Sequence, residues 1–597
     1  MTGALCGNAA QRARPVSPLH RTAAALRPAL TALLLTVLAG CASDLPPLVA
    51  SAPAPPYTVT ALAEPEACDG GFAAIDLDHR IEWLGGRITN FDTIGSGLAV
   101  GDLDNDGDLD LVLANLARPS TIFWNEGHWN EGLWNDGGMR FRPEPLATGA
   151  ARAVNAIDFD GDGWLDLAFT HPGAPPSLWL SVAAAGPDAA AYDRFHRVSR
   201  LGAGYIANAM GWGDLDGDGD LDLVTGSYNS ELPDLGGGFA IGGGVAYYEN
   251  DGGSLTLTLL APTAEALAVL LTDLNGDRLA DIVIGNDYDH PDQVFLRAPD
   301  ADAGWLAAAP FRATATNTMS YDAGDIDNDG RAELFVADMK PYQRDPAVTY
   351  AWERITILPP PDDVQANENV LLLPAAGGDA GAGGVTFANA APQRGVDATG
   401  WTWSAKFGDL DSDGFLDLYA VNGMIDSLVF GHLPDDELVE QNQALRNRGD
   451  GSFAPAPEWR LGSERSGRGM SMADLDGDGD LDVVVSNMRE PSQVFENRIC
   501  GGANLLVDLR QPGTANTHAI GAQVRLVGEL GGAPLHLTRE VRSQSGYFSG
   551  DTSRLHFGVP RGATLTRLEI RWPDGTRSHI PAPAAGTLVA ATHPAAR

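Results

Sequence analysis

The sequence predicts an all-β protein, a seven-bladed β-propeller with calcium-binding hairpin loops followed by a small β-sandwich-like domain. Three observations lead to this prediction. An acidic nine-residue loop recurs seven times, apolar β-type runs flank the copies, and the last hundred residues change from acidic to arginine-rich. The 71 glycines among 597 residues, with few helical stretches, also favour short strands joined by turns.

The first copy of the loop runs from Asp102 to Asp110, with carboxylates at positions 1, 3, 5 and 9 and Gly107 at position 6. Alternate spacing places the first three side chains on one side of a tight turn, and the glycine lets the chain reverse with a positive φ. Like charges about 5 Å apart repel by roughly 3 kcal/mol per pair at an effective dielectric near 20. Because all the ligands are hard oxygens, the loop is predicted to bind Ca²⁺ rather than zinc or copper.

This pattern occurs seven times, with spacings of 56, 56, 59, 52, 84 and 65 residues between successive first aspartates. One copy could be an ordinary acidic turn, but seven copies indicate a repeated structural unit. The predicted metal ligands are Asp102, Asp104, Asp106, Asp108 and Asp110; Asp158, Asp160, Asp162 and Asp166; Asp214, Asp216, Asp218 and Asp222; Asp273, Asn275, Asp277 and Asp281; Asp325, Asp327, Asp329 and Glu333; Asp409, Asp411, Asp413 and Asp417; and Asp474, Asp476, Asp478 and Asp482.

The position of the last ligand distinguishes these loops from EF-hands, which need a glutamate at position 12, where Leu113 and Phe169 stand in the first two loops. Apolar runs at 98–100 and 111–113 place the first loop between two strands of a hairpin. Units of roughly 60 residues with about four strands are typical of propeller blades. Equivalent loops would then form a rim of up to seven calcium ions on one face, leaving the opposite face and the axial channel free.

Two loops depart from the pattern. The fourth has Arg278 where the others have glycine, and a left-handed residue other than glycine costs about 1–2 kcal/mol. Asn275 also removes one charge, so the Asp273–Asp281 loop is predicted to be the weakest calcium site. The fifth loop ends in Glu333, whose side chain is longer by one methylene.

Residues 1–40 have the features of a lipoprotein signal peptide, since four arginines precede a short apolar run that ends in Leu38-Ala39-Gly40-Cys41. That ending resembles a bacterial lipobox, which implies cleavage before Cys41 and its lipidation. The alternative is an ordinary signal peptide with an incidental cysteine. The protein is therefore expected to be exported and lipid-anchored to the cell envelope, with the outer membrane favoured in a cell with two membranes.

Three segments are expected after the signal. Residues 41–66 are rich in alanine and proline and are predicted to form a tether. Residues 67–500 hold the seven repeats, and residues 501–597 a separate small β-domain. The net charge is −40. Because both ends are basic, the middle carries about −48, which disfavours nucleic acid or anionic lipid as its partner. Membrane contact is expected only through the lipid anchor.

A local repeat places Trp124, Trp129 and Trp134 five residues apart, each followed by asparagine, an acidic residue and glycine. This period suits neither a strand nor a helix. One interpretation is a duplicated hairpin turn whose rings pack on a blade. The other is an exposed aromatic platform for a glycan or protein partner.

Two cysteines remain if Cys6 leaves with the signal and Cys41 is acylated. Cys68 and Cys500 flank the seven repeats, and a closed propeller brings its first and last blades into contact. A Cys68–Cys500 disulfide is therefore predicted in the oxidising compartment, with two separately buried thiols as the alternative.

At this point the motifs resemble known families. The acidic loops resemble FG-GAP/VCBS repeats, as in the integrin α-chain propeller. The end of the chain resembles an ASPIC/UnbV domain, with matching stretches at 520–522, 539–541, 546–549, 555–558 and 571–575. The combination is similar to bacterial relatives of cartilage acidic protein. The resemblance implies this architecture but no particular activity, because the family has no general assigned chemistry.

Known catalytic motifs, namely HExxH, CxxC, G-x-S-x-G and the P-loop, are missing from the sequence, so no enzyme is expected. Two hypotheses follow. The favoured one is a calcium-stabilised, lipid-anchored extracytoplasmic binding or scaffold protein, serving adhesion or ligand binding with a protein or glycan on the free propeller face. The alternative is a calcium-dependent lyase or glycosidase that acts on polysaccharides in the propeller channel.

Overall fold

The computed structural model describes residues 53–595, with gaps at 66–67, 86–87, 128–138, 183–189, 199–204, 232–242, 289, 300–303, 343–363 and 376–384. The chain from Pro47 onward forms one compact unit. The expected signal peptide and the expected lipidation site Cys41 lie outside the described residues.

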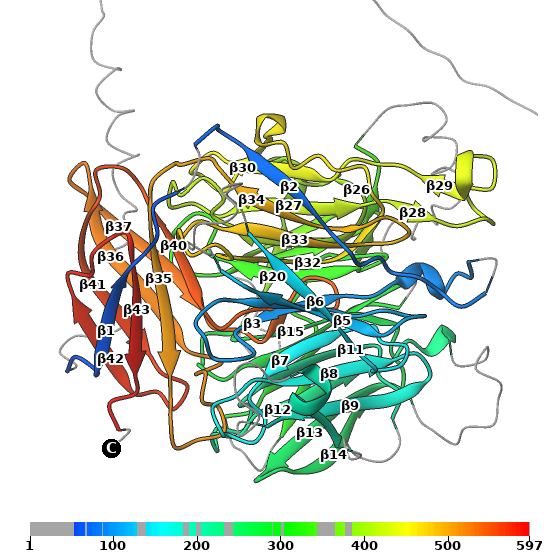
Figure 1. The fold of residues 1–597 in the computed structure, drawn as a ribbon, viewed down its shortest axis with the longest axis horizontal. Helices are drawn as coiled ribbons and strands as arrows, with labels where there is room; N and C mark the ends of the chain where they lie inside the picture. Colours follow the sequence, from blue (N-terminus) through cyan, green and yellow to red (C-terminus); the bar gives the residue numbers. More distant parts are fainter. Residues whose placement is uncertain are drawn as a thin grey trace, which may run out of the picture. The chain divides into compact units, whose positions relative to one another are not determined.

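Seven four-stranded antiparallel blades follow one another around a ring, which confirms the predicted propeller (Figure 1). The first four blades contain β3 (Leu98–Gly101), β4 (Asp110–Leu113), β5 (Ser120–Asn125) and β6 (Phe141–Leu146); β7 (Val154–Ile157), β8 (Asp166–His171), β9 (Ala174–Ser181) and β10 (Phe195–Val198); β11 (Ala209–Gly213), β12 (Asp222–Gly226), β13 (Val245–Asp251) and β14 (Ser254–Ala261); and β15 (Ala266–Thr272), β16 (Asp281–Asn286), β17 (Gln293–Arg297) and β18 (Trp305–Ala308).

The last three blades contain β20 (Ser320–Gly324), β21 (Glu333–Ala337), β24 (Val370–Pro374) and β25 (Phe387–Asn389); β26 (Gly400–Gly408), β27 (Asp417–Asn422), β30 (Gln443–Asn447) and β31 (Phe453–Pro455); and β32 (Gly467–Ala473), β33 (Asp482–Asn487), β34 (Ser492–Asn497) and β2 (Phe72–Leu77). Short additional strands are β19 (Thr314–Ala315), β22 (Met339–Lys340), β23 (Gln365–Ala366), β28 (Met424–Ile425) and β29 (Glu437–Leu438).

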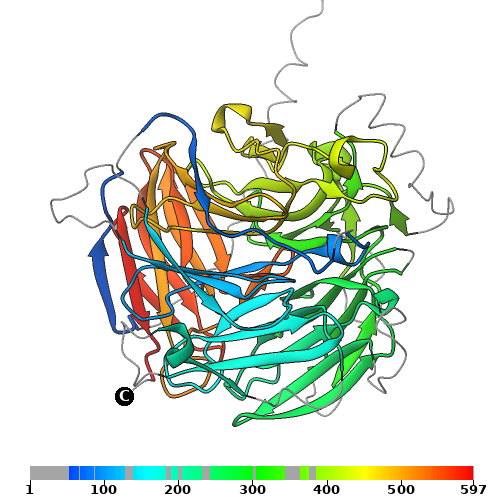
Figure 2. The same cartoon turned by 45° about the vertical axis from the view of Figure 1, so that its right-hand side comes forward.

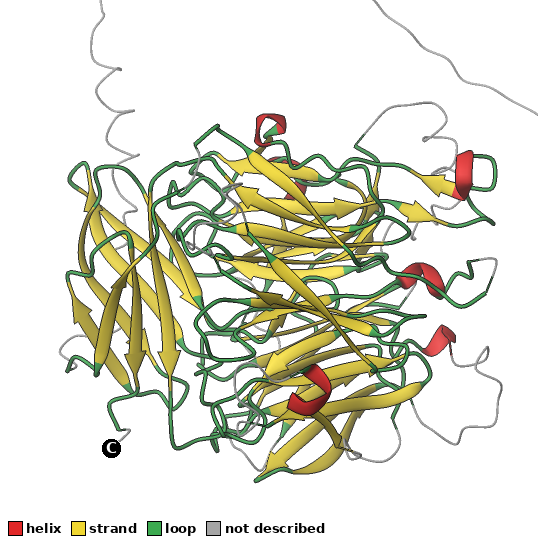
Figure 3. Cartoon of the chain, viewed as in Figure 1, coloured by secondary structure: helices red, strands yellow, loops and turns green. Residues whose placement is uncertain are grey.

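Helices are short and few among the described residues (Figure 3). They are α1 (Ala191–Arg194), α3 (Ala391–Arg394), η1 (Asp92–Ile94), η3 (Asn229–Glu231), η5 (Pro434–Asp436) and η6 (Pro457–Trp459).

The two ends of the repeat region close the ring. Strand β2, which precedes the first repeat, pairs antiparallel with β34 of the last blade. Cys68 and Cys500 form a disulfide next to this junction, with 5.5 Å between their Cα atoms, as the sequence predicts. Leu111 and Phe123 of blade 1 share a buried cluster with Val484 and Val494 of blade 7, so apolar packing also seals the join.

The C-terminal domain consists of two four-stranded sheets, one of which includes the N-terminal strand β1 (Figure 2, orange to red, with β1 in blue). One sheet has the order β1 (Tyr57–Ala61), β43 (Thr587–Thr592), β35 (Ala503–Arg510) and β40 (Leu555–Val559). The other has the order β37 (Ala533–Glu540), β36 (Gln523–Leu530), β41 (Thr564–Arg571) and β42 (Arg577–Pro581). Alternate apolar side chains of both sheets, such as Val507 and Leu568, are buried in one cluster.

Strand β1 corrects one boundary. The sequence analysis assigns residues 41–66 to a tether, but Tyr57–Ala61 form an edge strand paired with β43. All five residues of β1 are exposed, so this strand is held by backbone hydrogen bonds rather than by a core face. Tyr57, Thr58, Val59 and Thr60 favour a strand, but the alanine- and proline-rich composition of the surrounding segment hid this signal.

The axial channel is filled rather than free, which corrects a second expectation. Strands β38 (Gln544–Ser545) and β39 (Ser549–Gly550) of the C-terminal domain form a hairpin, and β39 pairs in parallel with β3 and with β7. We call residues 543–551 the channel hairpin. Cβ atoms at Gly97 and Gly211 would collide with Phe548 and Gln544 of this hairpin, so glycine makes the close approach possible.

The channel hairpin also bonds to the first strands of the other five blades. The Gln544 side chain accepts from Trp212 N and donates to Val269 O, both at 3.3 Å. The remaining three contacts are Gly546 N to Tyr321 O at 2.8 Å, Tyr547 N to Ser404 Oγ at 3.3 Å, and Met470 N to Ser549 Oγ at 3.1 Å. All seven blades therefore contact one segment of the C-terminal domain.

Replacing Tyr547 with alanine is expected to destabilise the whole protein. Tyr547 is fully buried, its hydroxyl donates to Ile94 O at 2.8 Å, and its ring packs on Trp403. Removing such a ring costs about 3–5 kcal/mol of unfolding free energy. Denaturant unfolding in calcium should show this loss, whereas Tyr192→Ala, at a 71% exposed site, should change stability by less than about 0.5 kcal/mol. Similar small effects for both variants would show that the hairpin does not hold the ring together.

Candidate metal-binding loops

Each acidic loop joins the first strand of a blade to the second, so all seven lie at the same end of the ring. The position-1 carboxylate organises each turn by accepting backbone N–H groups of its own loop. Asp409, for example, accepts from Asp413 N at 3.0 Å and from Gly414 N at 2.9 Å. In the loop of Asp214 the side chains of positions 1, 3 and 5 come together, as the alternate spacing predicts, whereas in loops such as that of Asp102 it is positions 1, 3 and 9 that do so.

The position-9 acid begins the second strand in every blade and ties the loop to the sheet. Asp110 accepts from Leu103 N at 3.0 Å with one oxygen and from Asn125 N, at the end of the third strand, at 2.8 Å with the other. The same pair of hydrogen bonds recurs at Asp166, Asp222, Asp281, Asp417 and Asp482. Glu333 keeps the first of these bonds, with Ile326 N at 3.1 Å. Position 9 therefore ties the loop to the second and third strands of the blade.

Two loop positions are left-handed. Position 6 has a positive φ in every loop, including Arg278 at φ 79°. Position 4 also has a positive φ, and its residues are Asn105, Gly161, Gly217, Gly276, Asn328, Ser412 and Gly477. The sequence analysis missed position 4, although its restriction to glycine, asparagine and serine was a readable signal.

The geometry gathers carboxylate oxygens as a cation site requires. In the loops that begin at Asp102, Asp158, Asp214, Asp325 and Asp409, three side chains place ligand oxygens within 4.8 Å of one another. Several carboxylate oxygens in three of these loops and in the seventh loop are buried and have no hydrogen-bond partner among the described residues, namely Asp104 Oδ1, Asp325 Oδ1, Asp327 Oδ1, Asp411 Oδ1 and Asp474 Oδ2. A buried carboxylate oxygen without a donor is costly, so these loops fit a hard divalent cation.

Burial and mutual repulsion raise the pKa values of these acids. Burial first, and neighbouring carboxylates second, raise the pKa of Asp409 to about 8. The pKa of Asp166 rises to about 8 and that of Glu333 to about 9, in both cases mainly because of burial. The more open Asp102 reaches about 6. Without a cation, part of the cluster therefore holds protons near neutral pH.

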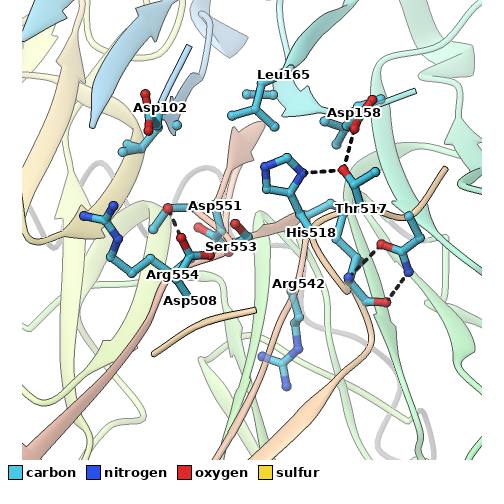
Figure 4. Close-up of a pocket in the computed structure, with 18 of the residues that line it drawn as sticks. Asp102, Asp158, Leu165, Asp508, Thr517, His518, Arg542, Asp551, Ser553 and Arg554 are labelled. Carbon is cyan, nitrogen blue, oxygen red and sulfur yellow. Dashed lines mark hydrogen bonds between the residues drawn. The ribbon is translucent and has the colours of Figure 1, made fainter. Parts of the chain in front are cut away.

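The C-terminal domain contacts this end of the ring. Asn516 N donates to Gly219 O at 2.8 Å, and Arg554 Nη2 donates to Gly107 O at 3.1 Å. The Thr517 hydroxyl donates to Asp158 Oδ2, a predicted metal ligand. A small cavity remains beside these contacts, lined by Asp102 and Asp158 of the propeller and by Thr517, His518 and Arg554 of the C-terminal domain (Figure 4).

Arginines of the C-terminal domain lie among the acids. Burial lowers the pKa of Arg539, while Asp409 and Asp325, the first ligands of two adjacent loops, raise it. Arg542 pairs with Glu540 at 2.8 Å and donates to Ala323 O at 2.7 Å. Arginines of the basic C-terminal domain thus lie against acids of the propeller loops, and the opposite charges attract each other.

The interpretation of the tryptophan repeat as an exposed aromatic platform is wrong for Trp124. Its ring is 3% exposed in β5, its Nε1 donates to Glu144 Oε2 at 2.8 Å, and the Arg194 guanidinium lies 5.3 Å from its centroid. Trp124 therefore packs on the blade, as the other interpretation states. Trp129 and Trp134 lie outside the described residues.

Metal-free protein should lose stability as pH rises. The acids have pKa values of about 4 when unfolded and about 6 to 9 in loops such as those of Asp214, Asp222 and Glu333. An acid whose pKa is raised by folding stabilises the folded state fully at pH values below its unfolded pKa. This stabilisation is lost as the pH rises through its folded pKa. The melting temperature in excess chelator should fall between about pH 5 and pH 8.5, and calcium should oppose that fall. A chelated melting temperature that rises with pH contradicts these shifts.

No helix in the described part of the chain is long and apolar enough to cross a membrane.

Two family models agree with this architecture. A family model described as ASPIC and UnbV matches residues 513–597, and an FG-GAP-like repeat model matches residues 102–169, 273–336 and 422–485. Cartilage acidic protein 1 of Xenopus tropicalis is 33% identical over 118 residues, which are 19% of this chain and 18% of that protein's length. The solved structure of rhamnogalacturonan lyase YesW has a TM-score of 0.33 and 12% identity, covering 74% of this chain and 76% of its own. FG-GAP-like repeats and a C-terminal ASPIC and UnbV domain are therefore found in this chain.

Proposed function

We propose that this protein is a calcium-stabilised, lipid-anchored extracytoplasmic protein that binds a ligand or serves as a scaffold at the cell surface. The observation that carries the calcium part is the set of buried carboxylate oxygens without donors in the first, fifth, sixth and seventh loops. Asp102–Asp110 and the six equivalent loops would hold up to seven ions, most weakly in the Asp273–Asp281 loop. Calcium would supply neutralising charge there rather than chemistry.

The geometry leaves one end of the propeller for a partner. The C-terminal domain occupies the loop end and the channel hairpin fills the axis, so a protein or glycan would bind the opposite face. That face carries β28 and β29, between which Leu428 is 78% exposed (Figure 1). Trp83 packs against a buried cluster that includes Ile425 of β28, and the Arg489 guanidinium lies 5.6 Å from its ring centroid.

The polysaccharide-active alternative depended on the propeller channel. Residues 543–551 now occupy that space, so the alternative has no site there. Among the described residues, His171 Nε2 lies 2.7 Å from Ser177 Oγ, which resembles part of a hydrolytic triad. However, its other ring nitrogen contacts the Ala150 carbonyl, and both side chains are buried. This pair therefore supports a structural role.

Removing calcium should lower the melting temperature strongly, because it exposes carboxylate repulsion in seven loops. Thermal unfolding measured in excess chelator should show the loss, and added calcium should reverse it better than magnesium, which demands a smaller octahedral site. Among single variants, Asp216→Ala should cost more than its matched control Asp277→Ala, in the loop that Arg278 weakens. An unchanged melting temperature in chelator would refute structural calcium, and equal costs would refute the ranking.

The anchor is tested at Cys41. In the native host, Cys41→Ser should abolish labelling by a radioactive fatty acid and should leave a precursor that keeps residues 1–40. Mass spectrometry of the purified chain gives the processing site independently. Fatty-acid labelling that persists in the variant would place the lipid elsewhere.

The binding activity is tested on a glycan array with the purified mature chain, with release of reducing ends measured in parallel. A scaffold or binding protein should retain defined glycans, or none if its ligand is a protein, and should release no reducing ends. Calcium-dependent release of reducing ends would instead establish the enzymatic alternative.

A further inference from the structure

Lysine is rare in this chain, and each copy contacts carboxylates in the fold. Of the 39 lysine and arginine residues, only Lys340 and Lys406 are lysines. Other cations at buried positions are arginines, such as Arg152 and Arg468. Arginine is generally preferred for buried ion pairs, because its planar guanidinium donates several hydrogen bonds and is weakly hydrated. A buried lysine in such a chain therefore points to a role that needs an amine.

Lys406 joins the propeller to the channel hairpin. It lies in β26, the first strand of the sixth blade, and its side chain is 5% exposed. Its ammonium contacts a carboxylate oxygen of Asp551, the last residue of the channel hairpin, whose side chain is 22% exposed. The stem of Lys406 packs on Gly546 of the hairpin, where an added Cβ would lie 3.2 Å from Lys406 Cγ. The amine and the carboxyl group are thus held together by two separate parts of the fold.

Two hydroxyl groups bind the carboxylate of Asp551. Ser545 Oγ donates to Asp551 Oδ2 at 2.7 Å, and Ser471 Oγ donates to Asp551 Oδ1 at 3.3 Å. The backbone N–H of Asp551 donates to Ser543 O at 3.0 Å, which fixes the residue at the base of the hairpin. Donors in these positions can stabilise the negative charge that develops on a carboxyl oxygen when its carbon is attacked.

A second carboxylate, Asp322, lies beside this pair. Asp322 is buried in β20, and its Oδ2 accepts from the backbone N–H of Phe407, the neighbour of Lys406, at 2.7 Å. Burial raises the pKa of Asp322 above its usual value, although the charges of Arg542 and Lys406 oppose this shift. Asp322 can therefore take up and release a proton more readily than an exposed aspartate at neutral pH.

Lys340 shows the ordinary alternative, a salt bridge in contact with water. Its ammonium contacts Glu368 at 2.8 Å and also Asp397, but its side chain is 31% exposed. Burial lowers the pKa of Lys340, yet the hydrogen bonds with Asp397 and Glu368 outweigh this effect and raise it. An ammonium that keeps its proton is not a nucleophile, so Lys340 is an internal control for Lys406.

We propose that Lys406 and Asp551 form an intramolecular isopeptide bond, which fastens the channel hairpin covalently to the sixth blade. The ammonium of Lys406 gives one proton to the carboxylate of Asp551, and the resulting amine attacks Cγ of the resulting carboxylic acid. Asp322 carries a second proton from Nζ to the departing hydroxyl group, which leaves as water. A C–N bond thus replaces a C–O bond, with no change of oxidation state and no further reactant.

The position of the pair favours this reaction. Groups that a fold holds in contact react as if they were at very high concentration. Asp551 also lines the small cavity between the propeller and the C-terminal domain, where a released water molecule has room (Figure 4). The bond would add a covalent link between propeller and C-terminal domain to the disulfide that closes the ring.

The first test is the intact mass of the chain from Ala42 to Arg597, purified in calcium and reduced before the measurement. We expect a mass below that of the sequence by one water molecule, about 18 Da. Trypsin does not cut after an acylated lysine. Digestion should therefore give a branched peptide that joins residues 395–446 to residues 543–554 through Lys406 and Asp551.

Three variants assign the groups. Lys406→Arg keeps the positive charge but cannot form the amide, so it should have the full mass. Asp322→Asn keeps both reacting groups but removes the proton carrier, so most molecules should also have the full mass. Lys340→Arg is the matched control and should retain the loss of water. Cooperative thermal unfolding in calcium shows that each variant is folded.

The full mass in the folded parent chain would overturn the proposal and leave Lys406 and Asp551 as a buried salt bridge. A loss of water that digestion places at Lys340 or at a loop aspartate, or one that persists in Lys406→Arg, would overturn it as well. Bond formation in Asp322→Asn would remove Asp322 from the reaction. The measurement involves neither the lipid anchor nor a ligand, so its result is independent of the proposed function.

Discussion

Repulsion between buried carboxylates is the constraint on which the rest of this structure depends. Each blade places several acids in the loop between its first two strands, and the position-9 acid bonds to the third strand as well. The loop and the sheet are therefore a single element, and the sheet cannot form fully while the loop charges are uncompensated. Protons, arginines or cations must supply that compensation. The raised pKa values of these acids follow from their burial and from the neighbouring carboxylates.

The C-terminal domain both increases the burial of the loop carboxylates and supplies positive charge that compensates them. It covers loop residues such as Asp409 and thereby removes water from them, but it brings Arg539 beside the same acid. Its channel hairpin also bonds to all seven first strands, while β2 and the Cys68–Cys500 disulfide close the ring from outside. The propeller and the C-terminal domain thus depend on each other, because residues of both fill the axial channel and cover the loop end.

The repeated features could be predicted from the sequence because every repeat has the same spacing of acids and strands. The blade number, the loop positions and the left-handed Arg278 follow from spacing and from the steric cost of a positive φ. The disulfide followed from the closure of a ring. Ligand positions 1, 3 and 9 do converge in loops such as that of Asp102, although the bound ion itself stays a prediction.

Features formed once, between distant segments, could not be predicted in this way. The channel hairpin has no periodicity, and its cue lay in Gly97 and Gly211, whose missing side chains make room for residues over 300 positions away. Strand β1 lacks a buried face, so a hydrophobic pattern cannot mark it. Trp124 had two interpretations because a short aromatic repeat gives no sign of which side its neighbours cover.

The most direct measurement of the central claim is the number of calcium ions bound by the intact chain, determined by native mass spectrometry after purification in calcium and exchange into a volatile buffer. Charge compensation by cations predicts several ions per chain, approaching the seven that the loops provide, with the Asp273–Asp281 site lost first on dilution. A folded, fully stable chain that carries no calcium would contradict the account, because its buried carboxylates would then be compensated by protons and arginines alone.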